Sequence, residues 1–303
     1  MNIVNTNLPV TSSLNLQNIR ALTAKYPFLR SEILTESAFG RPVPTLVLGT
    51  GPRKVIYGAS FHANEWITTP LLLRFAEELA EAYEAGGEIA RVEARRILER
   101  ATIYMVPMVN PDGVDLVLGE TSEEETAGAR LLASRYPRIP FPDGWKANLL
   151  GVDLNLQYPA GWRMAREIKF LQGYTRPGPR NFVGEAPLNQ KESRALAGYT
   201  EFLDPDLVLA YHTQGREIYW QYGDYEIPGA RALGEKLASV SGYRLAEAAY
   251  NSGFAGYTDW FIERFRRPGY TVEAGIGENP LQMDQFPKIY EDNLGILVTA
   301  ALG

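Results

Sequence analysis

The chain contains only two histidines, His62 and His212, and each follows an apolar run with the pattern of a buried strand. Ligand sites in open α/β sheets gather in the crevice at the carboxyl ends of the strands, so the two imidazoles are expected to lie there. Glu65 follows His62 by three residues, a spacing that turns both side chains to the same side of a helix start. Two imidazoles and a carboxylate form the ligand set of several catalytic zinc sites. The sequence therefore predicts one Zn²⁺ ion bound by His62, Glu65 and His212.

Glu273 closes another apolar, strand-like run and is followed by a glycine-containing turn. A carboxylate flanked by apolar residues is partly desolvated, which raises its pKa and suits it to act as a general base toward water. These residues can also be interpreted without any catalytic role. A lone histidine can be a core residue whose hydrogen bonds are satisfied, and Glu273 can be an exposed loop residue. The chemical interpretation is favoured because both histidines lie at strand ends, with acidic and amide residues in matching loops.

The composition excludes several other kinds of site. The chain has no cysteine, which rules out disulfides, thiolate metal sites and cysteine nucleophiles. Its 303 residues carry a net charge of −6 without a run of basic residues, so nucleic acid and anionic membranes are poor partners. No stretch resembles a signal peptide or reaches the roughly 18 consecutive apolar residues of a membrane span, which predicts a cytoplasmic protein. Phosphate-binding, H-E-x-x-H and G-x-S-x-G motifs are also missing.

Hydrophobic periodicity predicts alternating helices and strands, which is typical of an α/β fold with a mainly parallel or mixed sheet. We expect helices over residues 14–26, 68–83, 88–100, 190–202, 228–241, 258–265 and 284–301. We expect strands over residues 32–36, 44–48, 54–59, 102–108, 207–212 and 270–274. The segment Asn110–Gly113 is predicted to be a turn. The polar segments 119–150 and 156–188 are expected to be long surface loops that carry function.

Five segments resemble the zinc metallocarboxypeptidase family, which includes carboxypeptidase A. The resemblance covers about residues 15–300. It implies one α/β catalytic domain over residues 1–303, with residues 1–13 as an extension and helices around a mixed, mostly parallel sheet of about eight strands. The segments that carry the resemblance are Phe61-His62-Ala63-Asn64-Glu65-Trp66, Asn110-Pro111-Asp112-Gly113, Gly151-Val152-Asp153-Leu154-Asn155, Tyr211-His212-Thr213 and Thr271-Val272-Glu273-Ala274-Gly275.

The resemblance implies roles for individual residues. The two histidines and the glutamate named above are the zinc ligands, and Glu273 is the catalytic base that later protonates the leaving amine. Asp153 matches the aspartate that hydrogen-bonds the first histidine ligand. Asn155 matches a substrate-binding asparagine, although both Asp153 and Asn155 also suit ordinary turns.

Three positions depart from the family pattern. Leu156 stands where carboxypeptidases have the arginine that grips the free carboxylate of the substrate, and leucine cannot form that bidentate contact. Asn64 replaces a further arginine. Lys146, after Trp145, stands where an arginine stabilises the oxyanion, and its charge could serve that purpose or simply face solvent. Ordinary carboxypeptidase specificity is therefore not expected.

The amino-acid sequences of four segments resemble one branch of the family, the bacterial γ-D-glutamyl-L-diamino acid endopeptidases. That branch cuts the γ-D-glutamyl bond to meso-diaminopimelate or lysine in peptidoglycan stem peptides, which implies a small, polar peptide as substrate. The four segments are residues 61–69, 145–148, 151–157 and 212–215. The candidate pocket residues are Gln214, Arg216, Tyr250 and Thr258.

Two alternatives remain beside this interpretation. One is a zinc carboxypeptidase or an N-acyl amino acid amidohydrolase of the same fold. The other is a catalytically silent, zinc-dependent protein that binds wall peptides. The glutamate at position 273 argues against the silent protein, because Gln or Ala would be expected there.

Overall fold

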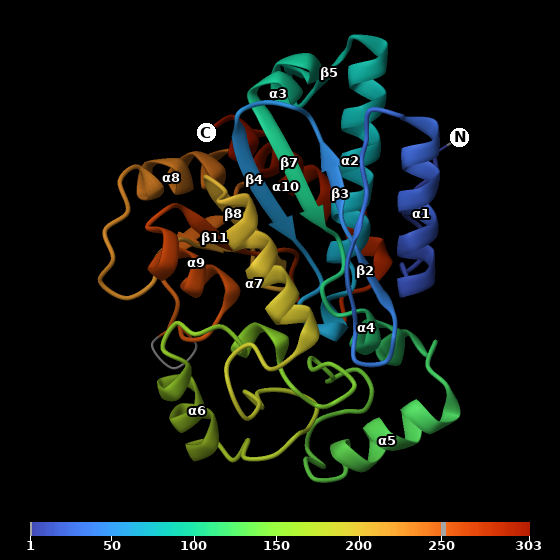
Figure 1. The fold of residues 1–303 in the computed structure, drawn as a ribbon, viewed down its shortest axis with the longest axis vertical. Helices are drawn as coiled ribbons and strands as arrows, with labels where there is room; N and C mark the ends of the chain where they lie inside the picture. The colour runs from blue at the N-terminus through green and yellow to red at the C-terminus, as the bar shows by residue number, and fades with distance from the viewer. Residues whose placement is uncertain (1, 250–252) are drawn as a thin grey trace.

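A computed structural model describes residues 2–249 and 253–303, whose main element is one seven-stranded sheet (Figure 1). Its strands are β3 Leu46–Leu48, β4 Arg53–Gly58, β7 Ala101–Val106, β8 Leu207–His212, β9 Glu217–Tyr219, β10 Arg244–Ala246 and β11 Gly269–Glu273. The strand order is β10-β9-β11-β8-β4-β7-β3. All neighbours pair in parallel except β9 with β11 and β3 with β7, so the sheet is mixed and mostly parallel, as predicted.

In the described part of the chain the central sheet has seven strands, where about eight were expected. The segment before β3 instead forms a separate two-stranded ladder of β1 Ile33–Glu36 and β2 Pro42–Pro44. Proline has no backbone N–H to donate to a central ladder, so Pro42 and Pro44 suit a peripheral pair of strands. The short strands β9 and β10 were not predicted from the sequence.

Side chains alternate along the central strands and divide the core into two layers. Along β8, Leu207 and Leu209 enter one buried cluster, while Val208 and Ala210 enter another. Five helices cover the first layer, and α7 and α9 cover the second (Figure 1). The helices of the first layer are α1 Ser12–Lys25, α2 Thr68–Ala85, α3 Ala94–Arg100, α8 Ala230–Ser241 and α10 Phe286–Leu302; those of the second are α7 Lys191–Leu203 and α9 Tyr257–Phe265.

The segment predicted as a turn, Asn110–Gly113, begins a helix, α4 Pro111–Leu118. The Asn110 side chain caps this helix by accepting a hydrogen bond from Gly113 N, and Pro111 occupies the first helical position. Gly113 is required for packing, since an added Cβ would lie 2.4 Å from the carbonyl oxygen of Ala147. The four residues therefore bring α4 close to the loop that follows α5.

Other local predictions are also wrong. The expected helix over residues 88–100 is a hairpin followed by the short α3, because Ala90 and Arg91 adopt positive φ. Each of the two expected long loops contains a helix, and one of these helices starts with a capping box between Ser122 and Glu125. These elements are β5 Glu88–Ile89, β6 Val92–Glu93, α5 Glu123–Ala133 and α6 Trp162–Leu171.

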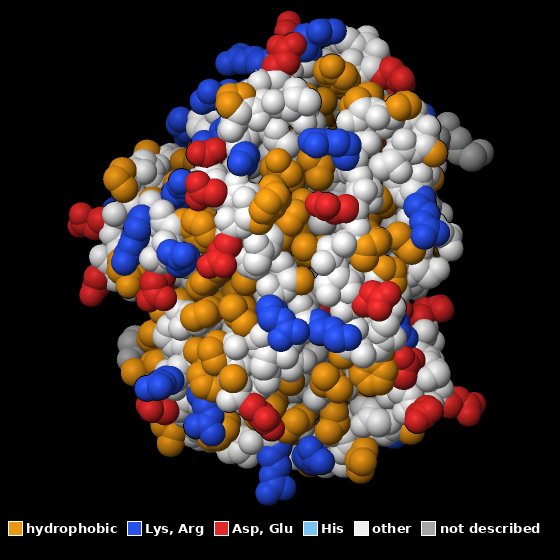
Figure 2. Space-filling model, in the orientation of Figure 1, with side chains coloured by type: hydrophobic (Ala, Val, Ile, Leu, Met, Phe, Trp, Pro, Cys, Tyr) orange, Lys and Arg blue, Asp and Glu red, His pale blue; other side chains and the backbone are white. Residues whose placement is uncertain are grey.

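The segments between α4 and α7 gather beyond the carboxyl ends of the central strands, as the green and yellow parts of Figure 1 show. They form a layer at the sheet edge to which the predicted zinc ligands belong. On the face drawn in Figure 2, basic and acidic side chains are interspersed, and neither sign forms a continuous patch. Within the described ranges, no helix is long and apolar enough to cross a membrane.

Candidate metal centre and substrate cavity

Three neighbouring strands bring the predicted active residues to one edge of the sheet. His212 is the last residue of β8 and Glu273 the last of β11, and the two residues pair in parallel register. On the other side of β8, β4 ends at Gly58 and the chain turns toward His62. Because the carboxyl ends of parallel strands meet at one edge, residues far apart in sequence become neighbours.

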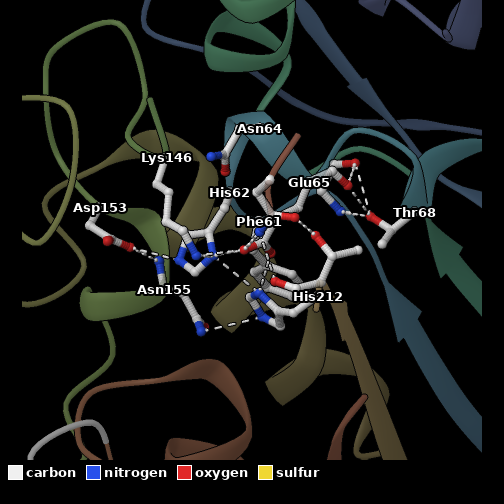
Figure 3. Close-up of polar contacts among 12 residues, drawn as sticks. Phe61, His62, Asn64, Glu65, Thr68, Lys146, Asp153, Asn155 and His212 are labelled. Atoms are coloured by element: carbon white, nitrogen blue, oxygen red, sulfur yellow. Dashed lines mark hydrogen bonds and ion pairs between the residues drawn. The ribbon is translucent and has the colours of Figure 1, made fainter. Parts of the chain in front are cut away.

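His62, Glu65 and His212 converge on one point (Figure 3). His62 caps a short 3₁₀ helix, η1 Ala63–Glu65, whose three-residue turn places Glu65 on the same side. Glu65 Oε1 lies 3.0 Å from His62 Nδ1, Glu65 Oε2 lies 2.8 Å from His212 Nδ1, and the two Nδ1 atoms are 3.2 Å apart. Ligand atoms around one tetrahedral zinc ion are separated by roughly 3.3 Å, so this donor set fits Zn²⁺.

Asp153 orients the first histidine. Its Oδ1 lies 3.2 Å from His62 Nε2, and its two oxygens also accept hydrogen bonds from the backbone N–H groups of Asn155 and Asn181. An imidazole that donates its Nε2–H presents an unprotonated Nδ1 to a metal, so Asp153 selects the ligating tautomer. Burial opposes the charge of Asp153, but the adjacent His62 ring, the Asn181 N–H group and the Lys146 charge together outweigh burial and lower the pKa of this carboxyl.

The electrostatics of the centre favour a cation. Burial alone would lower the pKa of His62, but the carboxylates of Glu65 and Asp153 raise it to about 9. Burial likewise opposes the charge of Glu65, yet the surrounding rings and Lys146 hold its pKa well below the ordinary value. Burial lowers the pKa of His212, which favours the neutral ring that a metal requires. The two carboxylates thus attract positive charge to the point where the donor atoms converge.

Lys146 lies beside the donor atoms. Its Nζ is 2.7 Å from Glu65 Oε1 and 3.5 Å from His62 Nδ1. The backbone of Lys146 is held in place because its carbonyl oxygen accepts hydrogen bonds from Ala63 N and from the side chain of Asn110. The lysine charge is therefore fixed at the edge of the centre, as Figure 3 shows.

Asn64, which stands where the family pattern has an arginine, serves a different purpose in this chain. It is 2% exposed, and its side-chain amide donates a 2.8 Å hydrogen bond to the carbonyl oxygen of Asp143. Its backbone N–H also donates to Trp145 O. Asn64 thus attaches the loop before Lys146 to η1, and it brings no charge to the substrate.

A cavity of about 250 Å³ opens beside the metal centre. Both histidines and Glu273 line it, together with Lys146, Asp153 and Leu156. Burial and the neighbouring Glu65 carboxylate raise the pKa of Glu273 to about 8, although Lys146 and His62 act in the opposite direction. A carboxyl group with this pKa can accept and return a proton near neutral pH.

Two of the predicted substrate-binding residues lie in this cavity. Asn155 lines it, with Nδ2 3.3 Å from His212 Nε2 and Oδ1 accepting a hydrogen bond from Tyr257 N. Thr258 also lines it, with its hydroxyl 2.7 Å from that of Thr271. Both side chains therefore have defined positions within reach of a bound substrate.

Two other predicted pocket residues, Gln214 and Arg216, lie elsewhere. Gln214 is exposed and does not belong to the cavity wall. Arg216 forms an ion pair with Asp292 at 3.2 Å and lies over the ring of Tyr243, also outside the wall. Tyr250 lies outside the described residues. A role for these three residues in substrate binding stays a prediction.

Several polar residues of this region were not predicted. Lys169, Arg180 and Asp259 line the cavity. Asn279 reaches Glu65 Oε1 at 3.4 Å and also exchanges two hydrogen bonds with Thr213. The sequence offers only a weak signal for these residues. Lys169, Arg180 and Asn279 lie in segments without a predicted helix or strand, and Asp259 lies in a predicted helix where nothing local marks it as facing a cavity.

Comparison with known proteins identifies relatives over nearly the whole chain. The sequence profile of the zinc carboxypeptidase family matches residues 16–295. The chain is 41% identical to gamma-D-glutamyl-L-diamino acid endopeptidase 1 of Lysinibacillus sphaericus, over 94% of this chain and 70% of that protein. It is 38% identical to the uncharacterized protein YqgT of Bacillus subtilis, over 93% of this chain and 74% of that protein. The fold matches the crystal structure of carboxypeptidase A from Helicoverpa armigera with a TM-score of 0.74 and 18% identity, covering 98% of this chain and 75% of that chain.

Proposed function

The chain belongs to the zinc carboxypeptidase family, and we propose that it hydrolyses the γ-D-glutamyl bond to a diamino acid in peptidoglycan stem peptides. The diamino acid is meso-diaminopimelate or lysine. The protein is a zinc metallopeptidase, with His62, Glu65 and His212 as its metal-binding set. The observation that supports the substrate most strongly is the 41% identity to a γ-D-glutamyl-L-diamino acid endopeptidase.

The proposed mechanism assigns proton transfer to Glu273. A bound zinc ion supplies Lewis acidity, which polarises the scissile carbonyl and lowers the pKa of water. Glu273 takes one proton from the attacking water and passes it to the leaving amine, so the products are a free γ-carboxylate and a free diamino acid. Its pKa of about 8 supports both transfers near neutral pH. Lys146 is placed to stabilise the negative charge that develops on the carbonyl oxygen.

The residue at the position of the family arginine also argues against ordinary carboxypeptidase action. Leu156 offers no hydrogen bond to a terminal carboxylate at the position of the family arginine. Asn155 and Thr258 supply uncharged polar groups instead. A small cavity with polar walls suits a short, charged peptide better than a long apolar side chain.

The same proposal treats residues 1–303 as one catalytic domain. The segment before α1 supports this, because Val4 and Val10 are buried in the larger core cluster. The carboxylate of Glu77 on α2 accepts hydrogen bonds from the backbone N–H groups of Ile3 and Val4.

The proposal is tested with the zinc-loaded protein and the tripeptide L-Ala-γ-D-Glu-meso-diaminopimelate. We expect mass spectrometry to detect free diaminopimelate, and we expect the Glu273→Gln variant to release none while it keeps its zinc. Peptides with ordinary α-linked C-terminal residues and N-acyl amino acids serve as competing substrates. An intact tripeptide, together with rapid cleavage of either competitor, would contradict the assignment. Tight binding of the tripeptide without turnover would identify the silent binding protein instead.

A further inference from the structure

Two cationic side chains line the cavity without a partner of their own. Lys169 lies on α6 and Arg180 in the loop that follows, and both belong to the wall that includes Glu273. Lys169 is only 9% exposed. Among the described residues, neither its ammonium group nor the guanidinium of Arg180 has a hydrogen-bond acceptor or an ion-pair partner. Burial of an unpaired cation is unfavourable, so an anionic ligand would relieve a real energetic penalty.

The loop around Arg180 is held against the metal centre by backbone hydrogen bonds. The carbonyl oxygen of Pro179 accepts bonds from Lys146 N at 2.7 Å and from Ala147 N at 2.9 Å. On the other side of Arg180, Asn181 N donates to Asp153 Oδ2 at 3.1 Å. Both chain neighbours of Arg180 are therefore attached to segments of the metal centre, so the backbone from which the guanidinium extends is fixed beside that centre.

Carboxylates of the protein do not neutralise these two cations. Burial lowers the pKa of Lys169, the nearby Asp153 raises it, and the charges of Arg180 and Lys146 lower it again. Both oxygens of Asp153 already accept hydrogen bonds from His62 and from backbone N–H groups. This part of the wall thus has an excess of positive charge and free donors.

We propose that Lys169 and Arg180 bind a free carboxylate of the substrate and replace the arginine that Leu156 does not supply. A guanidinium can bind a carboxylate with two parallel hydrogen bonds, and an ammonium adds a point charge. The inference rests on the proposed function, because a γ-D-glutamyl-diamino acid bond has a carboxylate on each side. On one side it is the α-carboxylate of D-glutamate. On the other it is the α-carboxylate of the diamino acid, to which meso-diaminopimelate adds a second carboxylate at its far end. All present the same chemistry to the two cations.

The test pairs two variants with three substrates. The variants are Arg180→Gln and Lys169→Met, and Arg176→Gln is the control because it changes an exposed arginine of the same loop outside the cavity wall. The substrates are the tripeptide, its analogue with the D-glutamyl α-carboxylate amidated, and its analogue with both diaminopimelate carboxylates amidated. For the tripeptide we expect kcat/KM to fall about 10- to 100-fold in Arg180→Gln, mainly through KM, since hydrogen bonds to charged groups have this value.

The amidated analogues identify the bound carboxylate, because the effects of a substitution in the protein and of an amidation in the substrate are not additive when the two groups interact. Amidation of the bound carboxylate should lower kcat/KM of the wild-type protein by a similar factor, and the two substitutions should lower it little further with that analogue. Amidation on the other side of the scissile bond should leave the effect of each substitution on kcat/KM unchanged. Equal losses for all three substrates would overturn the inference, because the variants would then act without reference to a carboxylate. A loss of the same size in Arg176→Gln would overturn it as well.

Binding measurements separate this inference from the proposed function. Calorimetry on Glu273→Gln and on Glu273→Gln/Arg180→Gln gives tripeptide affinities without turnover. If the wild-type protein fails to cleave the tripeptide, the proposed function is contradicted. The carboxylate site is still supported if Arg180→Gln lowers the affinity for the tripeptide but not for the analogue that lacks the bound carboxylate. If the tripeptide does not bind at all, the carboxylate site is contradicted too. Zinc content and thermal unfolding of each variant show whether the fold is retained.

Discussion

The cavity has two halves that are built differently. In one, the strand half, His62, His212 and Glu273 lie at the ends of adjacent strands. In the other, the loop half, Lys169 and Arg180 come from α6 and the loop after it. In the strand half the two histidine rings are in contact, whereas among the described residues the two loop-half cations have no partner.

This difference assigns metal binding and catalysis to the strand half and substrate selection to the loop half. Groups that must hold a metal ion need fixed geometry before the substrate arrives, and strand ends provide it. Groups that select a substrate must keep unused hydrogen-bonding capacity for it. Loops on a rigid scaffold can vary without disturbing the metal ligands, so the two tasks can change independently.

The largest expected effect is in the strand half, for His212→Ala. This change removes one of three donors, so zinc content should fall far below one ion per chain and kcat/KM on the order of 10³-fold or more. Elemental analysis after dialysis measures the zinc, and Glu273→Gln is the matched control that should retain it. Undiminished zinc in His212→Ala would show that the donor set is assigned wrongly.

Asp153→Asn probes the residue that joins the two halves. The amide can no longer accept the His62 hydrogen bond as a charged group, so zinc affinity should fall about 10- to 100-fold. Competition with a fluorescent chelator measures this affinity. Asp143→Asn, at an exposed position of the loop before Lys146, should leave it unchanged. Equal zinc affinities in the two variants would remove Asp153 from the metal centre.

The strand half could be predicted from the sequence because its signals are local and rare. Only two histidines exist, and both follow buried β-like runs, so position and chemistry coincide. The segment around the capping residue Asn110 could also be recognised in the sequence, but its Asn-Pro-Asp-Gly motif favours a turn as much as a helix start. Only the approach of Ala147 to Gly113 decides between them, and that contact is tertiary.

The loop half could not be predicted for a physical reason. Gly161, the residue before helix α6, has positive φ and no side chain to cap the helix, so no start signal precedes α6. Lys169 and Arg180 are common residue types, and nothing local marks them as facing a cavity. The position of Arg180 depends on backbone hydrogen bonds from residues 146, 147 and 181 to distant segments. The short strands β9 and β10 were missed similarly, since three-residue strands depend on their neighbours.

The next effect concerns stability and involves Asp259, a residue of α9 in the cavity wall. Burial raises the pKa of Asp259 to about 6; the Gly256 N–H hydrogen bond opposes this rise and the Glu263 charge adds to it. Because this pKa exceeds the unfolded value near 3.9, the native state binds the proton more tightly, and the resulting stability is lost as pH rises through about 6. An asparagine at position 259 does not ionise, so it avoids this loss of stability, and its side-chain oxygen can still accept the hydrogen bond from Gly256 N–H. Asp259→Asn should therefore be about 1–2 kcal/mol more stable than wild type at pH 8, an advantage absent at pH 4.

Urea unfolding at the two pH values measures that difference. Asp224→Asn, which changes an exposed aspartate, is the control and should have the same effect at both. A stability gain in Asp259→Asn that does not depend on pH would mean that the native carboxyl is solvated as in the unfolded chain.

The smallest expected effect uses salt to compare the two halves in one protein. Attraction of a substrate carboxylate by partly exposed cations is screened by salt, whereas metal ligands 1–2% exposed, such as Glu65 and His212, are screened far less. Between about 0.05 M and 0.5 M NaCl, KM for the tripeptide should rise roughly three- to five-fold while kcat stays within about two-fold. Arg180→Gln should show a flatter KM dependence than Arg176→Gln. A fall in kcat at constant KM would instead place the salt-sensitive charge in the strand half, where Lys146 contacts Glu65.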